Sequence, residues 1–213
     1  KKGTASTADL SKEALALTVE KAVQIAKHTS DDKYSGLAEA ELMVKDPVDL
    51  ELYYPQPLDT EQGIQLAMEA ETVAFEQDSR VGLSDGCTFN ANIGARVYGN
   101  THGVNVGYPS SRYGLTCVMI AQEENDMQRD YAYTVCREFS DMDPAAKIGK
   151  ESALNAVSRL GSRKLDTMSV PVLFHKELAP GLFGHLVSAI SGGSLYRKSS
   201  FLMDSINTQV LPD

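Results

Sequence analysis

Two stretches in the first part of the chain carry apolar residues at helical spacing. Ser11 is a good helix N-cap, and apolar residues recur every three or four positions after it. Asp59 precedes a second such pattern, and Gln62 completes a capping box with it. We therefore predict helices that begin after Ser11 and after Asp59. The acidic, proline-marked residues 29–58 between them predict an irregular connection.

Between residues 80 and 138 the apolar period changes from that of a helix to two, the period of a β-strand. Leu115, Cys117 and Met119, for example, alternate with Thr116 and Val118. Turn-forming residues interrupt the region at 84–86, 98–100 and 124–126. The pattern predicts an antiparallel meander of about four or five strands joined by short hairpins.

The last part of the chain returns to helical patterns. Asp143 as N-cap, Pro144 at the first helical position and Gly161 as a stop predict a helix over residues 143–160. A short buried strand is expected over residues 169–174, followed by a nearly all-apolar helix over residues 178–190. The predicted fold class is α+β, an antiparallel β-meander sheet with helices packed on one face.

Composition narrows the function classes. The 213 residues are 42% hydrophobic and 23% charged, which is ordinary for a globular protein, and the formal net charge is −9. That charge argues against direct nucleic-acid binding and against an anionic membrane surface, since both depend on clustered Lys and Arg. No apolar run approaches the length of a membrane span. The odd number of cysteines, without CxxC spacing, is typical of reduced core thiols in a cytoplasmic protein.

His185 is the sharpest candidate for a functional residue, because it lies within the apolar helix predicted over residues 178–190. One imidazole cannot hold a catalytic zinc, which needs about three protein ligands and an open position. We therefore interpret His185 as a buried structural histidine. A trio of His175, Glu177 and His185 matches no familiar zinc spacing. His102, between glycines in a predicted hairpin, is interpreted as a turn residue, with a polar group lining a peptide groove as the alternative.

The basic stretch at residues 194–200 has two readings of its own. It either binds a carboxylate or an acidic partner surface, or it reflects the preference for cations at a helix C-terminus. Ser194 and Ser199 have no His–Asp arrangement near them in sequence that would make either a nucleophile.

Several long, aperiodic stretches resemble the TldD/PmbA family, on its PmbA (TldE) side. They are residues 84–117, 124–141, 158–174 and 181–205. The resemblance implies that residues 1–213 are part of the N-terminal and central α+β domain of a longer chain, without the β-rich C-terminal domain that follows in the family. In the TldD-type sister subunit the helix matching residues 181–190 carries HExxxH. Here His185 occupies the first histidine position, while Leu186 and Ile190 replace the glutamate and the second histidine.

The resemblance therefore implies a subunit with no catalytic, metal or cofactor-binding residues of its own. The expected function is that of a non-catalytic PmbA/TldE-like subunit of a cytoplasmic metalloprotease complex. It would pair with a TldD-type zinc subunit, which would hold the zinc, and act on unfolded peptides, as in microcin maturation. An extended peptide would add backbone hydrogen bonds to the predicted sheet. The alternatives are a stand-alone metalloprotease with atypical ligands and a binding protein that modulates DNA gyrase.

Overall fold

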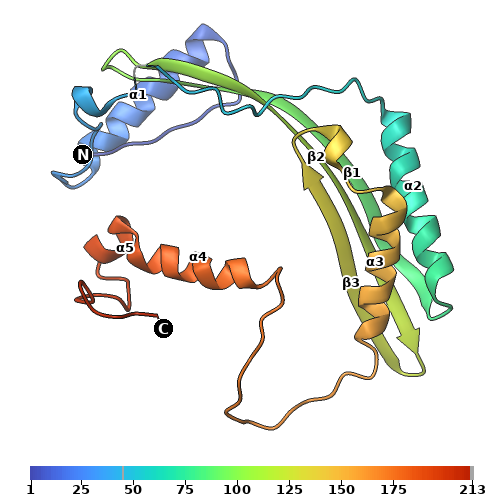
Figure 1. Cartoon of the computed structure of the whole chain (residues 1–213). Helices are drawn as coiled ribbons and strands as arrows, with labels where there is room; N and C mark the ends of the chain where they lie inside the picture. The colour runs from blue at the N-terminus through green and yellow to red at the C-terminus, as the bar shows by residue number, and fades with distance from the viewer. Residues whose placement is uncertain (45, 212–213) are drawn as a thin grey trace. The chain divides into compact units, whose positions relative to one another are not determined.

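The computed structural model describes residues 1–44 and 46–211, which divide into a unit from Lys1 to Ser162 and a second from Arg163 onward. The elements of the first unit, in chain order, are α1 (Lys12–His28), the 3-10 turn η1 (Ala40–Leu42), α2 (Thr60–Gln77), β1 (Val81–Gly99), β2 (Asn105–Glu123), β3 (Asp126–Cys136), the 3-10 turn η2 (Phe139–Asp141) and α3 (Ala145–Ser158). The second unit holds α4 (Ala179–Ile190) and α5 (Gly192–Tyr196) (Figure 1).

Helices α1 and α2 begin where their capping residues predict. The Ser11 side chain accepts a hydrogen bond from the Ala14 N–H at 3.3 Å. Asp59 accepts from the Gln62 N–H at 2.8 Å, and the Gln62 side chain accepts from the Asp59 N–H at 3.0 Å. These bonds satisfy N–H groups that the first helical turn leaves without partners. Between the two helices, η1 is the only helical turn among the described residues, so the irregular connection is also confirmed.

The sheet has three antiparallel strands in the order β1-β2-β3, so the predicted count of four or five strands is wrong. The error arises at residues 84–86, which look like a turn in the sequence. Instead β1 continues through them with a shift of register between Ser84 and Gly86, and Gly86 takes the positive φ of 108° that glycine tolerates. The predicted turns near residues 98–100 and 124–126 are confirmed as the hairpins that join the strands.

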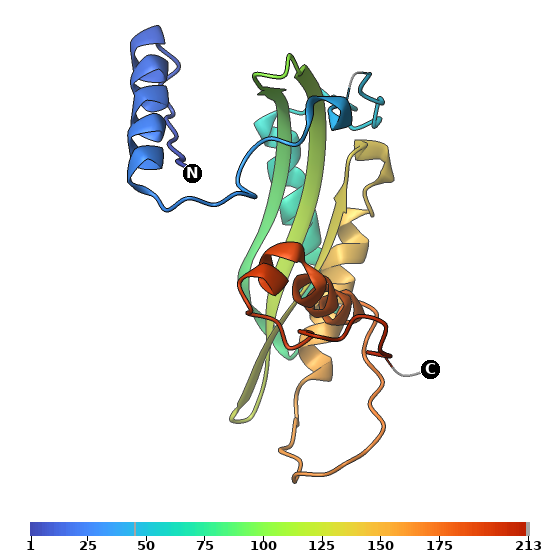
Figure 2. The same ribbon diagram turned by 90° about the vertical axis from the view of Figure 1, so that its left-hand side faces the viewer.

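Helices α2 and α3 lie side by side on one face of the sheet (Figures 1 and 2). Strand β2 supplies the centre of the core, because every second side chain faces these helices. The fully buried members of that row are Tyr113, Leu115, Cys117, Met119 and Ala121. The predicted fold class, α+β with helices on one face of an antiparallel sheet, is therefore confirmed.

Small residues let α3 approach its neighbours closely. The sequence pattern places Leu154 inward, but its side chain is 48% exposed. The buried residues of α3 include Gly149 and Ala153 instead. A Cβ atom on Gly149 would overlap the carbonyl oxygen of Ala70 in α2. Just beyond the C-terminal end of α3, the N–H of Gly161 donates to the Asp126 side chain at 2.6 Å, which ties it to the β2–β3 hairpin.

The second unit differs from expectation in one segment. Residues 169–174, all of which the structure describes, form no strand, and Leu173 is 98% exposed. An apolar run becomes a strand only where another strand accepts its backbone hydrogen bonds, and the described part of this unit contains none. The apolar helix is confirmed as α4. No helix in the described residues combines the length and apolar character needed to cross a bilayer.

An ion pair links the end of α2 to the start of the sheet. Arg80 donates to both carboxylate oxygens of Asp78, from Nε at 2.9 Å and from Nη2 at 2.8 Å. The Arg80 backbone N–H also donates to this carboxylate, at 2.9 Å. These hydrogen bonds lower the pKa of Asp78 to about 2. The guanidinium makes the largest contribution to this shift, and the backbone N–H makes the next largest.

We expect the Asp78–Arg80 pair to make folding stability depend on pH. A carboxyl whose pKa is lowered by folding stabilises the fold above its unfolded pKa of about 3.9, and that stability is lost as pH falls toward the folded value. Thermal melting of wild type and Asp78→Asn between about pH 2 and pH 6 measures this. The wild-type advantage should be full above about pH 4 and shrink toward pH 2. A constant difference across the range would contradict the assignment.

Candidate functional site

Helix α4 carries the three residues that the sequence resemblance places opposite HExxxH. His185 is exposed, Leu186 is half-buried and Ile190 is 54% exposed. The interpretation of His185 as a buried histidine is thus wrong, because Ala189 is the one residue of α4 that its surroundings bury. Leu186 and Ile190 end in hydrocarbon and have no atom that could bind a metal or accept a proton.

The donor set around α4 does not fit a zinc ion. Among the described residues, no group of three or more His, Cys, Asp or Glu side chains lies close enough together to hold a metal. The structure thus does not bring His175, Glu177 and His185 together as a ligand set. Instead His175 accepts, at Nδ1, a hydrogen bond of 3.4 Å from the Glu177 N–H. Its carbonyl oxygen accepts from the N–H groups of Leu178 and Ala179, which leads the chain into α4.

The remaining polar candidates serve local structure. His102 lies exposed in the β1–β2 hairpin, and its N–H donates to the Asn100 side chain at 3.0 Å, as a turn residue should. Ser194 and Ser199 are occupied by hydrogen bonds within the turn around α5: the Ser199 hydroxyl donates to the Ser194 carbonyl at 3.2 Å. Arg197 is the C-cap of α5, so part of the basic stretch lies at a helix C-terminus.

Cys87 and Cys117 belong to the packing between sheet and helices. All three are free, and Cys87 and Cys117 are direct partners across β1 and β2. Cys117 is fully buried. The hydrogen bond with the Cys117 thiol is the main cause of a raised pKa at the Cys87 thiol, and burial raises that pKa further. Burial likewise raises the pKa of Cys136. Thiols whose pKa is raised stay protonated and are poor nucleophiles. The prediction of a core thiol fits Cys117, which is buried, whereas Cys87 and Cys136 are only half-buried.

A different feature of the first unit has the geometry of a binding site. Where β3 ends, two buried side chains of β2 fix the connection between α1 and α2 against the sheet. Ser111 accepts at Oγ from the Tyr54 N–H at 2.8 Å, and its own N–H donates to the Leu52 carbonyl at 2.9 Å. The Tyr113 hydroxyl donates to the Tyr54 carbonyl at 3.0 Å and accepts from the Gln56 N–H at 2.8 Å.

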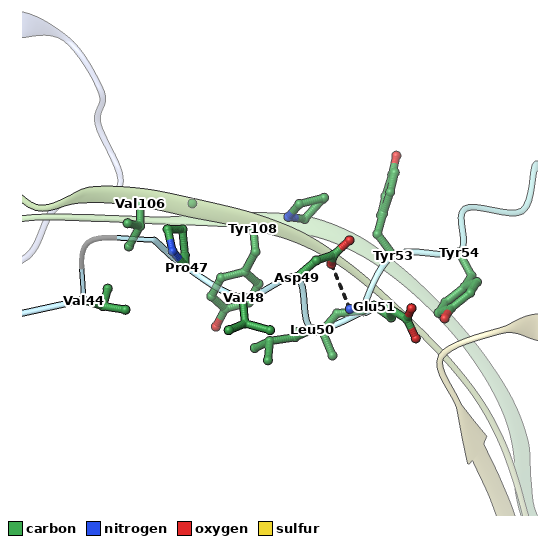
Figure 3. A pocket seen from close by; sticks show the side chains of 13 residues that line it. Val44, Pro47, Val48, Asp49, Leu50, Glu51, Tyr53, Tyr54, Val106 and Tyr108 are labelled. Atoms are coloured by element: carbon green, nitrogen blue, oxygen red, sulfur yellow. Dashed lines mark hydrogen bonds between the residues drawn. The ribbon is translucent and has the colours of Figure 1, made fainter.

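Held in this way, the connection walls a groove of about 940 Å³ beside β2 (Figure 3). The lining is mostly apolar, and its residues are Val44, Pro47, Val48, Asp49, Leu50, Glu51, Leu52, Tyr53, Tyr54, Val106, Gly107, Tyr108 and Pro109. Asp49 and Glu51 place two carboxylates on the wall formed by the connection. An open, apolar groove beside a strand suits an extended peptide.

A smaller polar hollow of about 350 Å³ adjoins the groove, since Leu52 and Tyr108 line both. Arg96 of β1 and Arg137, which follows β3, line it together with Ser110. None of the lining residues is acidic. Arg137 donates to the Ser111 carbonyl at 3.4 Å. Sequence reasoning missed this hollow, because register and chain reversal, not sequence spacing, bring the two arginines together.

Both parts of the chain match models of known protein domains. Residues 53–160 match the family model described as PmbA/TldA metallopeptidase central domain, and residues 167–213 match the PmbA/TldA metallopeptidase C-terminal domain. The chain is 47% identical over 213 residues to Metalloprotease PmbA of Escherichia coli O157:H7, covering 100% of this chain and 47% of that protein. It is 47% identical over 212 residues to the Metalloprotease PmbA homolog of Haemophilus influenzae, with the same coverage. The chain thus spans about half the length of these curated relatives.

Solved structures share the fold at low sequence identity. A putative modulator of DNA gyrase from Bacteroides thetaiotaomicron matches with a TM-score of 0.83 and 20% identity, covering 98% of this chain and 48% of that one. Another, from Thermotoga maritima, matches with a TM-score of 0.73 and 21% identity, over 91% and 44%. TldE from Thermococcus kodakarensis matches with a TM-score of 0.63 and 17% identity, over 95% and 46%.

Proposed function

The chain belongs to the PmbA/TldD metallopeptidase family, and from that premise we propose that it is part of a PmbA/TldE-type subunit that does not itself cleave peptides. The full-length protein would pair in the cytoplasm with a TldD-type zinc subunit, and the pair would act on unfolded peptides. This subunit would contribute shape and peptide contacts, and its partner would contribute the metal chemistry.

The observation that carries this proposal is the side-chain content of α4. A hydrolytic zinc site needs about three protein ligands and a base for the attacking water. At the positions of the family motif this chain offers one imidazole, His185, and two hydrocarbon side chains, Leu186 and Ile190. Elsewhere in the described residues no cluster of potential ligands replaces them. The side chains of the described residues therefore do not fit a hydrolytic zinc site.

The groove beside β2 supports the peptide-handling part of the proposal. An unfolded peptide presents unpaired backbone groups and apolar side chains, which a strand edge and an apolar wall can receive. The groove offers Val106 and Tyr108 on the strand side and Val48 and Leu50 on the other. Its open form suits binding without sequence specificity, as a subunit that receives unfolded chains requires.

We expect the full-length protein made alone to contain no stoichiometric zinc and to leave an unfolded peptide uncleaved. Adding the TldD-type subunit should produce cleavage. Elemental analysis and mass spectrometry of the peptide, with and without that subunit, make the measurement. Near one zinc per chain, together with cleavage by the isolated protein, would overturn the proposal and favour a stand-alone metalloprotease with atypical ligands.

A pair of variants locates the chemistry within the assembly. His185→Ala in this protein should leave cleavage by the assembled complex within about twofold of wild type, because an isolated imidazole holds no metal. The matched control replaces the first histidine of HExxxH in the TldD-type subunit, which should abolish cleavage. Loss of activity in His185→Ala, with unchanged melting temperature and unchanged assembly, would make His185 a functional residue.

A further inference from the structure

One edge of β2 has no strand partner over its first part. Strand β2 pairs with β1 from residue 105 to residue 121, but its pairing with β3 begins only at Tyr113. Within the described part of the chain, residues 105–110 have no ladder partner on the β3 side. The edge closes at Ser111, whose N–H donates to the Leu52 carbonyl at 2.9 Å. An unpaired edge of this kind is a template for an added strand.

The residues of this edge suit an incoming strand. Backbone groups alternate between the two sides of a strand, so Asn105, Gly107 and Pro109 face the same side as Ser111. Proline has no N–H, so Pro109 can offer an incoming strand only its carbonyl oxygen. Gly107 and Asn105 keep both an N–H and a carbonyl for pairing. At about 3.3 Å per residue, the edge accommodates roughly five residues of extended peptide.

The closed end of the edge determines where such a peptide must stop. The connection between α1 and α2 occupies the edge from Ser111 onward, through the hydrogen bonds to Leu52 and Tyr54. A strand paired with residues 105–109 therefore ends beside Ser110, which lines the polar hollow. The end of the peptide, not its middle, would lie there.

The charge of the hollow selects which end. Arg96 and Arg137 both line it, and neither is among the described residues that pair with a carboxylate, although the chain as a whole carries a net charge of −9. Arginine binds carboxylates through parallel N–H donors, whereas it repels an ammonium group. Asp49 and Glu51 lie on the groove wall and are not among the residues lining the hollow.

We propose that this groove binds the C-terminal end of an extended peptide, which pairs with the free edge of β2 and places its terminal carboxylate between Arg96 and Arg137. The peptide runs parallel to β2, because its C-terminus lies toward Ser110. Apolar side chains of the peptide pack against Val106 and Tyr108. The inference rests on the proposed function only in taking the peptide to be a substrate or product of the complex.

Equilibrium binding to the full-length subunit alone tests the inference without any cleavage. The probe is an unfolded, mostly apolar eight-residue peptide with an N-terminal fluorophore, followed by fluorescence anisotropy. Three forms are compared: a free C-terminal carboxylate, a C-terminal amide, and an amide with one internal aspartate. The free acid should bind about tenfold or more tightly than the plain amide. The amide with an internal aspartate should not regain the affinity that is lost when the C-terminal carboxylate is amidated.

Arginine variants assign the carboxylate to the hollow. Arg96→Gln and Arg137→Gln should each weaken binding of the free acid toward that of the amide, while leaving the amide unchanged. Arg163→Gln removes the same charge outside the hollow and is the matched control. Melting temperatures identify any variant that merely unfolds, and Arg96→Gln is the cleaner of the two because Arg137 also contacts the Ser111 carbonyl.

Three results would overturn the inference. Equal affinity for acid and amide would remove the carboxylate site, and unchanged acid binding in the Arg96→Gln, Arg137→Gln double variant would move it elsewhere. If the amide with an internal aspartate bound as tightly as the free acid, the hollow would recognise an acidic side chain and not a terminal carboxylate. None of these outcomes bears on zinc content or cleavage, so the proposed non-catalytic role stands or falls separately.

Discussion

Replacing Gly149 by valine is expected to lower the free energy of unfolding by about 3 kcal/mol or more. A Cβ at this position overlaps the carbonyl oxygen of Ala70, and its carbonyl carbon lies 2.8 Å away. The obstacle is helix backbone, so no side-chain rotation relieves it. Helices α2 and α3 would have to separate, which would loosen the cover over the core row of β2.

Chemical denaturation of the full-length protein, followed by circular dichroism, measures the effect. Gly149→Ala should already be destabilised, since the overlap begins at Cβ. Gly184→Ala in α4 is the matched control, because a Cβ there meets nothing within 4 Å. Alanine at an unobstructed helix interior should be neutral or stabilise by up to about 1 kcal/mol. A Gly149→Val protein as stable as wild type would show that the two helices do not touch at this point.

The second large effect is expected at Tyr113, which is fully buried and joins the groove wall to the sheet. Tyr113→Ala should cost about 3–5 kcal/mol, as for other large-to-small aromatic changes. Tyr113→Phe keeps the ring and its edge-on contact with Phe139, whose centroid lies 5.7 Å away. It leaves the Gln56 N–H and the Tyr54 carbonyl without their partner, at a cost of about 1–3 kcal/mol.

Local hydrogen exchange separates the two contributions of Tyr113. In Tyr113→Phe, amide protection should fall mainly in residues 52–56, while β2 and β3 keep theirs. Tyr131→Phe is the control, because Tyr131 is 49% exposed on the outer face of β3. Its stability should lie within about 0.5 kcal/mol of wild type. Uniform loss of protection in Tyr113→Phe would mean that the hydroxyl supports the whole sheet and not the groove wall.

The parts of the fold that the sequence predicts well are those set by near neighbours. The N-cap at Ser11, the capping box of Asp59 with Gln62, and the alternation that buries Leu115 all depend on residues within a few positions of one another. Strand count was mispredicted because Ser84–Asp85–Gly86 has the composition of a turn, whereas the pairing of β1 with β2 carries the strand through it. Long-range pairing decides between a bulge and a turn.

Residues of the candidate site divide in the same way. The identities of Leu186 and Ile190, which the resemblance places opposite the glutamate and second histidine of HExxxH, can be read from the sequence because both lie on one helix. The exposure of His185 is not visible, since it depends on what packs against α4. Arg96 and Arg137 belong to different strand ends, and only the register of β1 with β2 and the return of β3 bring them to one hollow.

The chain order of the first unit has a consequence for how the protein forms. Helix α2, the three strands, the turn η2 and α3 follow one another along the chain, and each strand pairs with the next strand in sequence. Helix α2 packs most extensively against α3, so its main contact forms once α3 has been made. Because short hairpins join the strands, little chain entropy is lost when neighbouring strands pair, which favours rapid folding of the sheet. The sheet and both of its covering helices can therefore assemble while the ribosome is still making the residues from Arg163 onward.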